Sequence, residues 1–234
     1  MKLYEVGGAV RDKYLGVPTK DVDFAVEAKS YNEMRDWMVD NGFTIFVETP
    51  EYFTIRAKPP ANSPLSERTN GADFVLCRKD SPGSDGRRPD YVEVGTIYDD
   101  LARRDFTVNA MAIDVDSGEL IDPHGGMGDL KLHVLRFVGN PTARIREDGL
   151  RTMRAFRFQI TKNLWPWGIT NDCINSAFAA EMLRGVSIER VREELERMLK
   201  HDTFGSLVMF RKMQEHTLRA IFRDGLRLSA TLKD

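Results

Sequence analysis

Residues 7–24 read GGAVRDKYLGVPTKDVDF and contain a glycine pair, ending at Gly8, and an aspartate pair, Asp21 and Asp23. Glycines directly after a strand let backbone N–H groups approach a bulky anion, and Arg11 lies one turn further on if a helix begins there. Asp21 and Asp23 are spaced i, i+2, so on a strand both side chains leave the same face. Adjacent carboxylates repel each other unless a cation lies between them, and Mg²⁺ is the usual cation. The stretch predicts a phosphoryl-transfer site, with phosphate at the glycines and Mg²⁺ at the aspartates.

Each half of this pattern has a structural alternative, because a glycine pair is often a turn and an aspartate pair is often a surface feature. Their combination within 17 residues favours the site. The Gly-Lys-Ser/Thr pattern of P-loop nucleotide hydrolases does not occur in the sequence, which argues against that class of enzyme.

The composition is that of a folded protein with a core. Of 234 residues, 41% are hydrophobic, and the 30% that are charged nearly cancel to a net charge of −2, which excludes a disordered chain. The two cysteines, Cys77 and Cys173, cannot build a disulfide framework. The first residues turn polar too soon for a signal peptide, and no apolar run approaches a membrane span. We therefore expect a soluble, cytoplasmic protein with no membrane partner.

The charges are distributed unevenly along the chain. Residues 1–135 carry 16 Lys and Arg against 24 Asp and Glu, a net charge of −8, whereas residues 136–234 carry 18 against 12, a net charge of +6. An acidic part suits cations and a basic part suits a polyanion, so this asymmetry is consistent with a metal site followed by a nucleic-acid surface. A solvated helical face is the alternative explanation of the basic part.

The periodicity of apolar residues divides the chain at about residue 140. The first part predicts a helix at 31–41, loops at 59–71 and 80–90, and strands at 3–6, 23–27, 43–48, 53–57, 73–78 and 91–94. The second part predicts helices at 147–158, 171–183 and 187–200, and a helix or helix pair at 204–222. The expected fold class is α+β, with a mixed-sheet domain at 1–140 and a small helical domain at 141–234.

Two later segments carry further candidate residues. In RRDFTVNA (103–110), a guanidinium at Arg104 suits a triphosphate or a sugar, and Asp105 and Asn109 suit ribose hydroxyls. The alternative is an Arg-Asp pair that caps a short helix. On the predicted 147–158 helix, an arginine ridge with i, i+3, i+6 spacing is formed by Arg151, Arg154 and Arg157. Its alternative is a set of surface arginines paired with Glu147 and Asp148.

Together with the 7–24 stretch, four later segments resemble the ordered motifs of one family. They are RRDFTVNAMAID (103–114), DPHGGMGDLKLHVLRFVGNP (122–141), REDGLRTMRAFRF (146–158) and VSIERVREELERML (186–199). The family is that of tRNA nucleotidyltransferases and bacterial poly(A) polymerases, the class II branch of the DNA polymerase β-like nucleotidyltransferases. The resemblance implies a catalytic head followed by a helical neck and body.

The resemblance also implies roles for individual residues. Asp21 and Asp23 would be catalytic and hold Mg²⁺, with Asp73 as a tentative third carboxylate whose alternative is an edge-strand acid. The triphosphate would be cradled by Gly8, Arg11 and Arg104. Asp148 and Arg151 would offer an acceptor and a forked donor to the base edge of the incoming nucleotide, and Arg154 and Arg157 would meet base or phosphate.

The implied activity is addition of CCA, from CTP and ATP, to the 3′ end of tRNA or another RNA, with release of pyrophosphate. A poly(A) polymerase or A-adding enzyme of the same family is an alternative, and a non-catalytic nucleotide- or RNA-binding module is an alternative of another class. The segment at 78–92 resembles the flexible loop that CCA-adding and A-adding members keep, whereas 59–71 has no clear family equivalent. Association of two chains into a homo-oligomer stays open.

Overall fold

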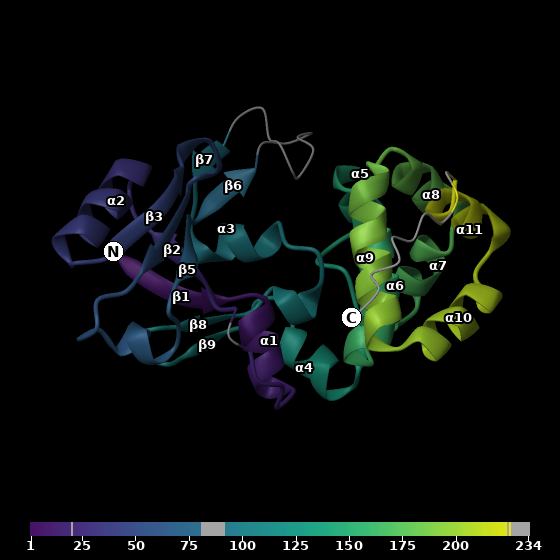
Figure 1. The fold of residues 1–234 in the computed structure, drawn as a ribbon, viewed down its shortest axis with the longest axis horizontal. Coiled ribbons are helices and arrows are strands. Elements are labelled where there is room, and N and C mark those ends of the chain that lie inside the picture. The colour runs from purple at the N-terminus through teal and green to yellow at the C-terminus, as the bar shows by residue number, and fades with distance from the viewer. Residues whose placement is uncertain (20, 81–91, 224, 226–234) are drawn as a thin grey trace, which may run out of the picture. The chain divides into compact units, whose positions relative to one another are not determined.

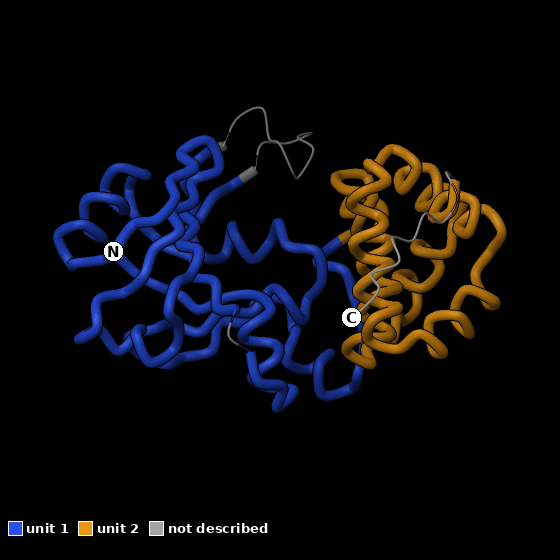
Figure 2. Tube along the Cα trace, viewed as in Figure 1, with its two compact units in different colours: residues 1–139 blue, residues 140–234 orange. Residues whose placement is uncertain are grey.

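The computed structural model describes residues 1–19, 21–80, 92–223 and 225. The loop expected at 80–90, with the family resemblance at 78–92, therefore lies largely outside the described residues. The chain divides into two compact units, residues 1–139 and 140–234, which Figure 2 distinguishes by colour. Each unit is described by itself.

The first unit is built on a seven-stranded mixed sheet (Figure 1). Its strands, in spatial order, are β3 (Thr44–Thr49), β4 (Thr54–Lys58), β5 (Ala72–Leu76), β2 (Asp23–Glu27), β1 (Lys2–Val6), β8 (Ala112–Asp114) and β9 (Leu120–Ile121). The β2–β5 pair is parallel and the other neighbours are antiparallel. This mixed sheet confirms the fold class expected for the head.

Short helices cover and connect the strands of this sheet. They are α1 (Gly8–Tyr14), α2 (Tyr31–Asp40), α3 (Ile97–Ala102), α4 (Gly126–Lys131) and the 3₁₀ turns η1 (Pro50–Tyr52), η2 (Pro64–Glu67) and η3 (Thr107–Asn109). The predicted helix at 31–41 is confirmed, because Ser30 caps α2 by accepting a hydrogen bond from Glu33 N, and Met34 and Met38 are buried. They join a core in which the rings of Phe24 and Phe74 stack 5.0 Å apart.

Two predictions for the first unit are wrong in detail. The strand predicted at 73–78 ends at Leu76, because the carbonyl oxygen of Cys77 accepts a hydrogen bond from Gly95 N and not from a strand of the main sheet. The chain then continues into a separate two-stranded ladder of β6 (Arg78–Asp80) and β7 (Val92–Val94). The predicted loop at 59–71 contains η2, whose Leu65 is buried in the core of the sheet. Burial of one apolar side chain thus anchors that segment.

The second unit is helical apart from β11 (Trp165–Pro166), as far as its described residues extend. Its helices are α5 (Pro141–Glu147), α6 (Leu150–Lys162), α7 (Ile169–Ile174), α8 (Ala177–Arg184), α9 (Ile188–His201), α10 (Thr203–Lys212) and α11 (Glu215–Ile221). The first unit ends with β10 (Val134–Leu135). Helix α9 lies along α6, with Val191, Leu195 and Met198 buried. None of the described helices is long and apolar enough to cross a membrane.

The helix predicted at 147–158 begins too early. Asp148 has extended backbone angles, φ −150° and ψ 105°, and follows α5, whereas α6 begins at Leu150. The break is fixed by packing, since a Cβ on Gly149 would lie 2.2 Å from Met182 O in α8. Asp148 therefore lies in a turn between two helices and not on the same helix as Arg151. The helix predicted at 171–183 is likewise divided, into α7 and α8, where Ser176 caps α8.

Candidate functional site

Two arginine side chains lie close to the glycine pair that follows β1. Gly7 has φ 71°, a left-handed value that favours glycine. A Cβ on Gly7 would lie 2.8 Å from Arg104 Nη1, and a Cβ on Gly8 would lie 3.4 Å from Arg11 Nη2. Both predicted triphosphate-binding arginines therefore lie against the glycine turn, so their charge is next to the backbone predicted to receive phosphate.

Asp21 and Asp23 lie on the same side of the chain at the start of β2. Both are exposed, whereas Val22 and Phe24, which alternate with them, are buried. This alternation confirms that the two carboxylates share a face, although Asp21 lies before the strand begins.

Asp73 lies beside this pair on the neighbouring parallel strand. It is the register partner of Asp23 in the β2–β5 ladder, and it accepts a hydrogen bond from Arg56 Nη1 at 3.4 Å. The pKa of Asp23 is raised, first by desolvation and then by the negative charges of Asp73 and Asp21, while Arg104 acts in the opposite direction. The edge-strand alternative for Asp73 is wrong, because β5 lies inside the sheet between β4 and β2.

Arg104 is oriented by Asp100, a residue that was not predicted from the sequence. Arg104 donates to Asp100 Oδ2 from Nε at 3.1 Å and from Nη2 at 2.8 Å, and Arg103 donates to Oδ1 from Nε at 3.0 Å. Burial of Asp100 opposes its ionisation, but Arg104 and Arg103 together hold its pKa below the ordinary value. The i, i+3 and i, i+4 spacing in DLARR is a signal that could have identified this pairing.

Arg11, Asn109 and Asp105 form one buried network. Arg11 Nη1 donates to Asn109 Oδ1, and Asn109 Nδ2 donates to Asp105 Oδ1 at 2.9 Å. Arg11 Nε also donates to Asp12 Oδ1 at 2.8 Å. All four residues are buried. The network holds η3 against α1, so the predicted ribose contacts of Asp105 and Asn109 stay predictions alongside this structural role.

The predicted base-reading residues lie in the second unit. Asp148 accepts a two-pronged ion pair from Arg190 of α9, at 3.3 Å from Nη1 and 2.9 Å from Nη2, and it also accepts from Leu150 N at 3.1 Å. Arg151 Nη1 donates to Glu147 Oε2 at 2.6 Å and to Arg144 O at 3.0 Å. Both members of the predicted pair are thus held in fixed positions by neighbouring residues.

The arginines of the predicted ridge make different contacts. Arg157 Nε donates to Glu194 of α9, and its guanidinium carbon lies 4.4 Å from the centre of the Phe158 ring. Burial lowers the pKa of Arg157, and Glu194 acts in the opposite direction. Arg154 lies 5.6 Å from the same ring. Arg157 therefore links α6 to α9, while its contact with base or phosphate stays a prediction.

The head domain model of the poly A polymerase family matches residues 3–136. The chain belongs to this family. The match confirms the resemblance seen in the sequence and covers every predicted site residue of the first unit. The four predicted site residues of the second unit lie outside the matched head domain.

Curated CCA-adding enzymes are similar to this chain in sequence. A CCA-adding enzyme of Lacticaseibacillus paracasei is 36% identical over 203 residues, which cover 84% of this chain and 46% of that enzyme. The CCA-adding enzyme of Geobacillus thermodenitrificans is 37% identical over 198 residues, covering 84% and 45%. The chain thus spans about half the length of the curated relatives it matches.

Solved structures of the family are also similar. A tRNA nucleotidyltransferase complexed with a primer tRNA and an incoming ATP analog matches with a TM-score of 0.75 and 31% identity, over 97% of this chain and 61% of that chain. The Bacillus stearothermophilus CCA-adding enzyme in complex with CTP matches with a TM-score of 0.69 and 31% identity, over 86% and 45%.

The carboxylates of the head domain fit the divalent cation that nucleotidyltransferases typically use. Among the described residues no three His, Cys, Asp or Glu side chains converge as a complete metal cage. Mg²⁺ does not require one, because it keeps several waters and binds through one or two carboxylates and substrate phosphates. Asp21 and Asp23 fit that donor set. Desolvation and the negative charges of Asp73 and Asp21 raise the pKa of Asp23, although Arg104 and Arg56 act in the opposite direction, so a bound cation would stabilise the ionised carboxylate.

An Asp23→Asn substitution in the head domain should stabilise the metal-free protein at neutral pH. Because the pKa of Asp23 is raised in the folded state, the free energy of unfolding falls as pH rises above the ordinary aspartate pKa and Asp23 ionises. An asparagine at this position does not ionise, so the variant does not lose this free energy. The difference should vanish below the ordinary aspartate pKa. Added Mg²⁺ should raise the melting temperature of the wild type more than that of the variant, as thermal melts at two pH values would show. Equal melting behaviour of the two proteins throughout would contradict the assignment.

Proposed function

We propose that this chain carries the catalytic head and neck of a tRNA nucleotidyltransferase that adds CCA to tRNA 3′ ends from CTP and ATP. The observation that carries the proposal is the place of Asp23, next to Asp21 and in register with Asp73 and with Val6, which precedes the Gly7–Arg104 contact, in a head domain of this family. The names of the curated relatives, and the CTP, ATP analog and primer tRNA in the similar structures, support this choice of substrates.

In this proposal the head residues bind and orient the triphosphate and the RNA end. Asp21 and Asp23 would hold Mg²⁺, which would lower the pKa of an attacking 3′-hydroxyl and would offset the charge of the leaving pyrophosphate. Arg104, held in place by Asp100, would bind the triphosphate against the glycine turn. Arg11 would bind the triphosphate together with Arg104, and its hydrogen bond to Asn109 would help to orient Asp105 and Asn109 toward the ribose.

Base selection would depend on Asp148 and Arg151. A carboxylate and a guanidinium present one acceptor and a fork of donors, which fit cytosine or adenine and mismatch guanine or uracil. Arg190 and Glu147 would be positioning residues, because each holds one member of the pair.

Replacing Arg190 with lysine should therefore weaken base selection. Lysine keeps the charge but cannot form the two-pronged contact with Asp148, so discrimination of CTP from UTP should fall by roughly tenfold while overall folding is kept. The matched control is Arg197→Lys on the same helix, because Arg197 is 60% exposed and lies 3.8 Å from its partner Glu194. Steady-state incorporation of each nucleotide would measure the effect. Unchanged discrimination in the Arg190 variant would contradict the positioning role.

The proposed function is tested with labelled nucleotides and a tRNA transcript that lacks its 3′ end. Incorporation of C followed by A supports CCA addition. Tailing with ATP alone would instead support a poly(A) polymerase or A-adding enzyme, which the description of the matching head domain makes the nearest alternative. Absence of Mg²⁺-dependent pyrophosphate release would overturn the enzymatic proposal in favour of a binding module.

A further inference from the structure

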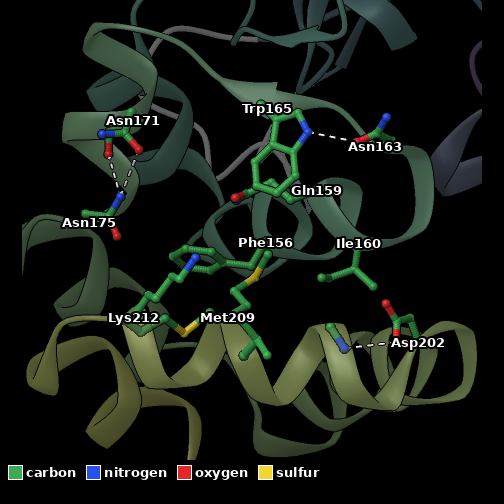
Figure 3. A pocket seen from close by; sticks show the side chains of 13 residues that line it. Phe156, Gln159, Ile160, Asn163, Trp165, Asn171, Asn175, Asp202, Met209 and Lys212 are labelled. Carbon is green, nitrogen blue, oxygen red and sulfur yellow. Dashed lines mark hydrogen bonds between the residues drawn. The ribbon is translucent and has the colours of Figure 1, made fainter.

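A pocket of about 490 Å³ lies within the helical unit, and none of the residues placed in the proposed site lines it. It is bounded by α6, the segment around β11, α7 and α10. Figure 3 shows Trp165 on one side of the pocket and Phe156, Met209 and Lys212 on the other. A space of this size is typical of small-ligand sites.

The aromatic wall of the pocket is held in a fixed orientation. Trp165 Nε1 donates to Asn163 Oδ1 at 2.8 Å, so the ring is anchored at one edge, yet the residue is 53% exposed. The arrangement leaves one face of the indole available to a planar partner.

Carboxamides supply the hydrogen-bonding groups around this wall. Asn175 Nδ2 donates to Asn171 O at 2.9 Å, and Gln159 Nε2 donates to Ala155 O at 3.3 Å. Within the described part of the chain, Gln159 Oε1 and Asn171 Nδ2 are left with no hydrogen-bond partner. One acceptor and one donor therefore remain, which is the mixed complement that a nucleobase edge requires.

The charges of the pocket are separated along α10. Lys212 ends the helix and has no ion-pair partner among residues that the structure describes, whereas Asp202 caps the other end by accepting from Gly205 N at 2.9 Å. At 1.5 Å per residue the ten-residue helix separates the two charges by about 15 Å. An anionic group would therefore lie toward Lys212 and away from Asp202.

We infer that this pocket binds one unpaired nucleotide of the RNA substrate, with its base against Trp165 and a phosphate toward Lys212. A free phosphate would leave the aromatic wall unused, and a purely apolar segment would bury the carboxamides without partners. Unpaired RNA bases are recognised by aromatic stacking combined with amide hydrogen bonds, and the basic charge of residues 136–234 suits the attached backbone. The inference rests on the proposed RNA substrate but concerns a different surface from the proposed active site.

The test is equilibrium binding of a fluorescent tRNA transcript lacking its 3′ CCA, measured over a range of salt concentrations. Trp165→Ala should weaken binding roughly five- to a hundredfold without changing the salt dependence, because a stacking contact is lost and no phosphate contact. Trp165→Phe should restore most of the affinity. The matched control is Trp167→Ala, since Trp167 is 75% exposed and does not line the pocket.

The phosphate position is tested with Lys212→Gln and the control Arg211→Gln, which removes a neighbouring charge outside the pocket. Only the Lys212 variant should reduce the salt slope, by about 0.7 for one single-strand phosphate. Equal affinities of the Trp165 and Trp167 alanine variants, or no binding of RNA by the wild type, would overturn the inference. Nucleotide addition to a short primer, assayed in parallel, tests the proposed function separately.

Discussion

Replacing Asp21 with alanine should abolish nucleotide incorporation while leaving the protein folded. Asp21 and Asp23 share one exposed face, and in the proposed mechanism both carboxylates hold Mg²⁺. Loss of one would remove several kcal/mol of transition-state charge stabilisation, which is on the order of a thousandfold in rate. Stability should not fall, because the substitution removes one member of a repelling pair. Labelled CTP incorporation and a thermal melt would measure the two effects.

The control for this variant is Asp40→Ala, which removes an exposed carboxylate at the end of α2 in the same unit. It should leave incorporation unchanged. Normal turnover by the Asp21 variant would refute the assignment of the aspartate pair, whereas loss of activity accompanied by unfolding would show that Asp21 has a structural role.

Asp100→Asn should destabilise the head domain by about 3 kcal/mol, because it leaves two partly buried guanidinium groups without their shared counter-charge. It should also lower incorporation by roughly tenfold to a hundredfold, since Arg104 loses the contacts that orient it. Denaturant unfolding gives the first quantity, and steady-state kinetics with CTP gives the second. A rise in KM for the nucleotide is expected, because Arg104 would bind the triphosphate.

The pH dependence separates this effect from a general loss of packing. Because the folded pKa of Asp100 is lowered, its contribution to stability is present above the ordinary aspartate pKa and is lost as pH falls through the folded value. The difference in free energy of unfolding between the wild type and the Asp100→Asn variant should therefore become smaller at acidic pH. The control Asp36→Asn removes an exposed carboxylate whose ion pair with Arg35 is 3.7 Å long, and it should change stability by little. A gap independent of pH would contradict the ionic explanation.

The sequence predicted the class of fold because its signals are local. The short apolar run Phe24–Val26 marks β2, and the cap at Ser30 with buried Met34 and Met38 marks α2. The predicted extent of the strand at 73–78 and the start of the helix at 147 were wrong for another reason. Both breaks depend on partners distant in the chain, Gly95 for Cys77 and Met182 for Gly149.

The same distinction applies to the candidate site. Residue type and spacing predicted Asp21, Asp23 and Arg104 as candidates, and in the structure Asp23 lies in register with Asp73 and within electrostatic reach of Asp21 and Arg104. The contacts that hold the predicted residues in place were not predicted. Asp100 is close in sequence but has no motif of its own, and the pairing of Arg190 with Asp148 joins residues 42 apart. The second pairing arises only when α9 packs against the turn that holds Asp148.

Gly149 packs so closely against Met182 O that the position of the α8 backbone determines the position of the turn that carries Asp148. A substitution that tilts α8 would displace this carboxylate without altering any side chain of the proposed nucleotide site. In the proposed mechanism, substitutions around Met182, 34 residues after Asp148, would therefore change substrate preference although they lie outside the proposed site residues.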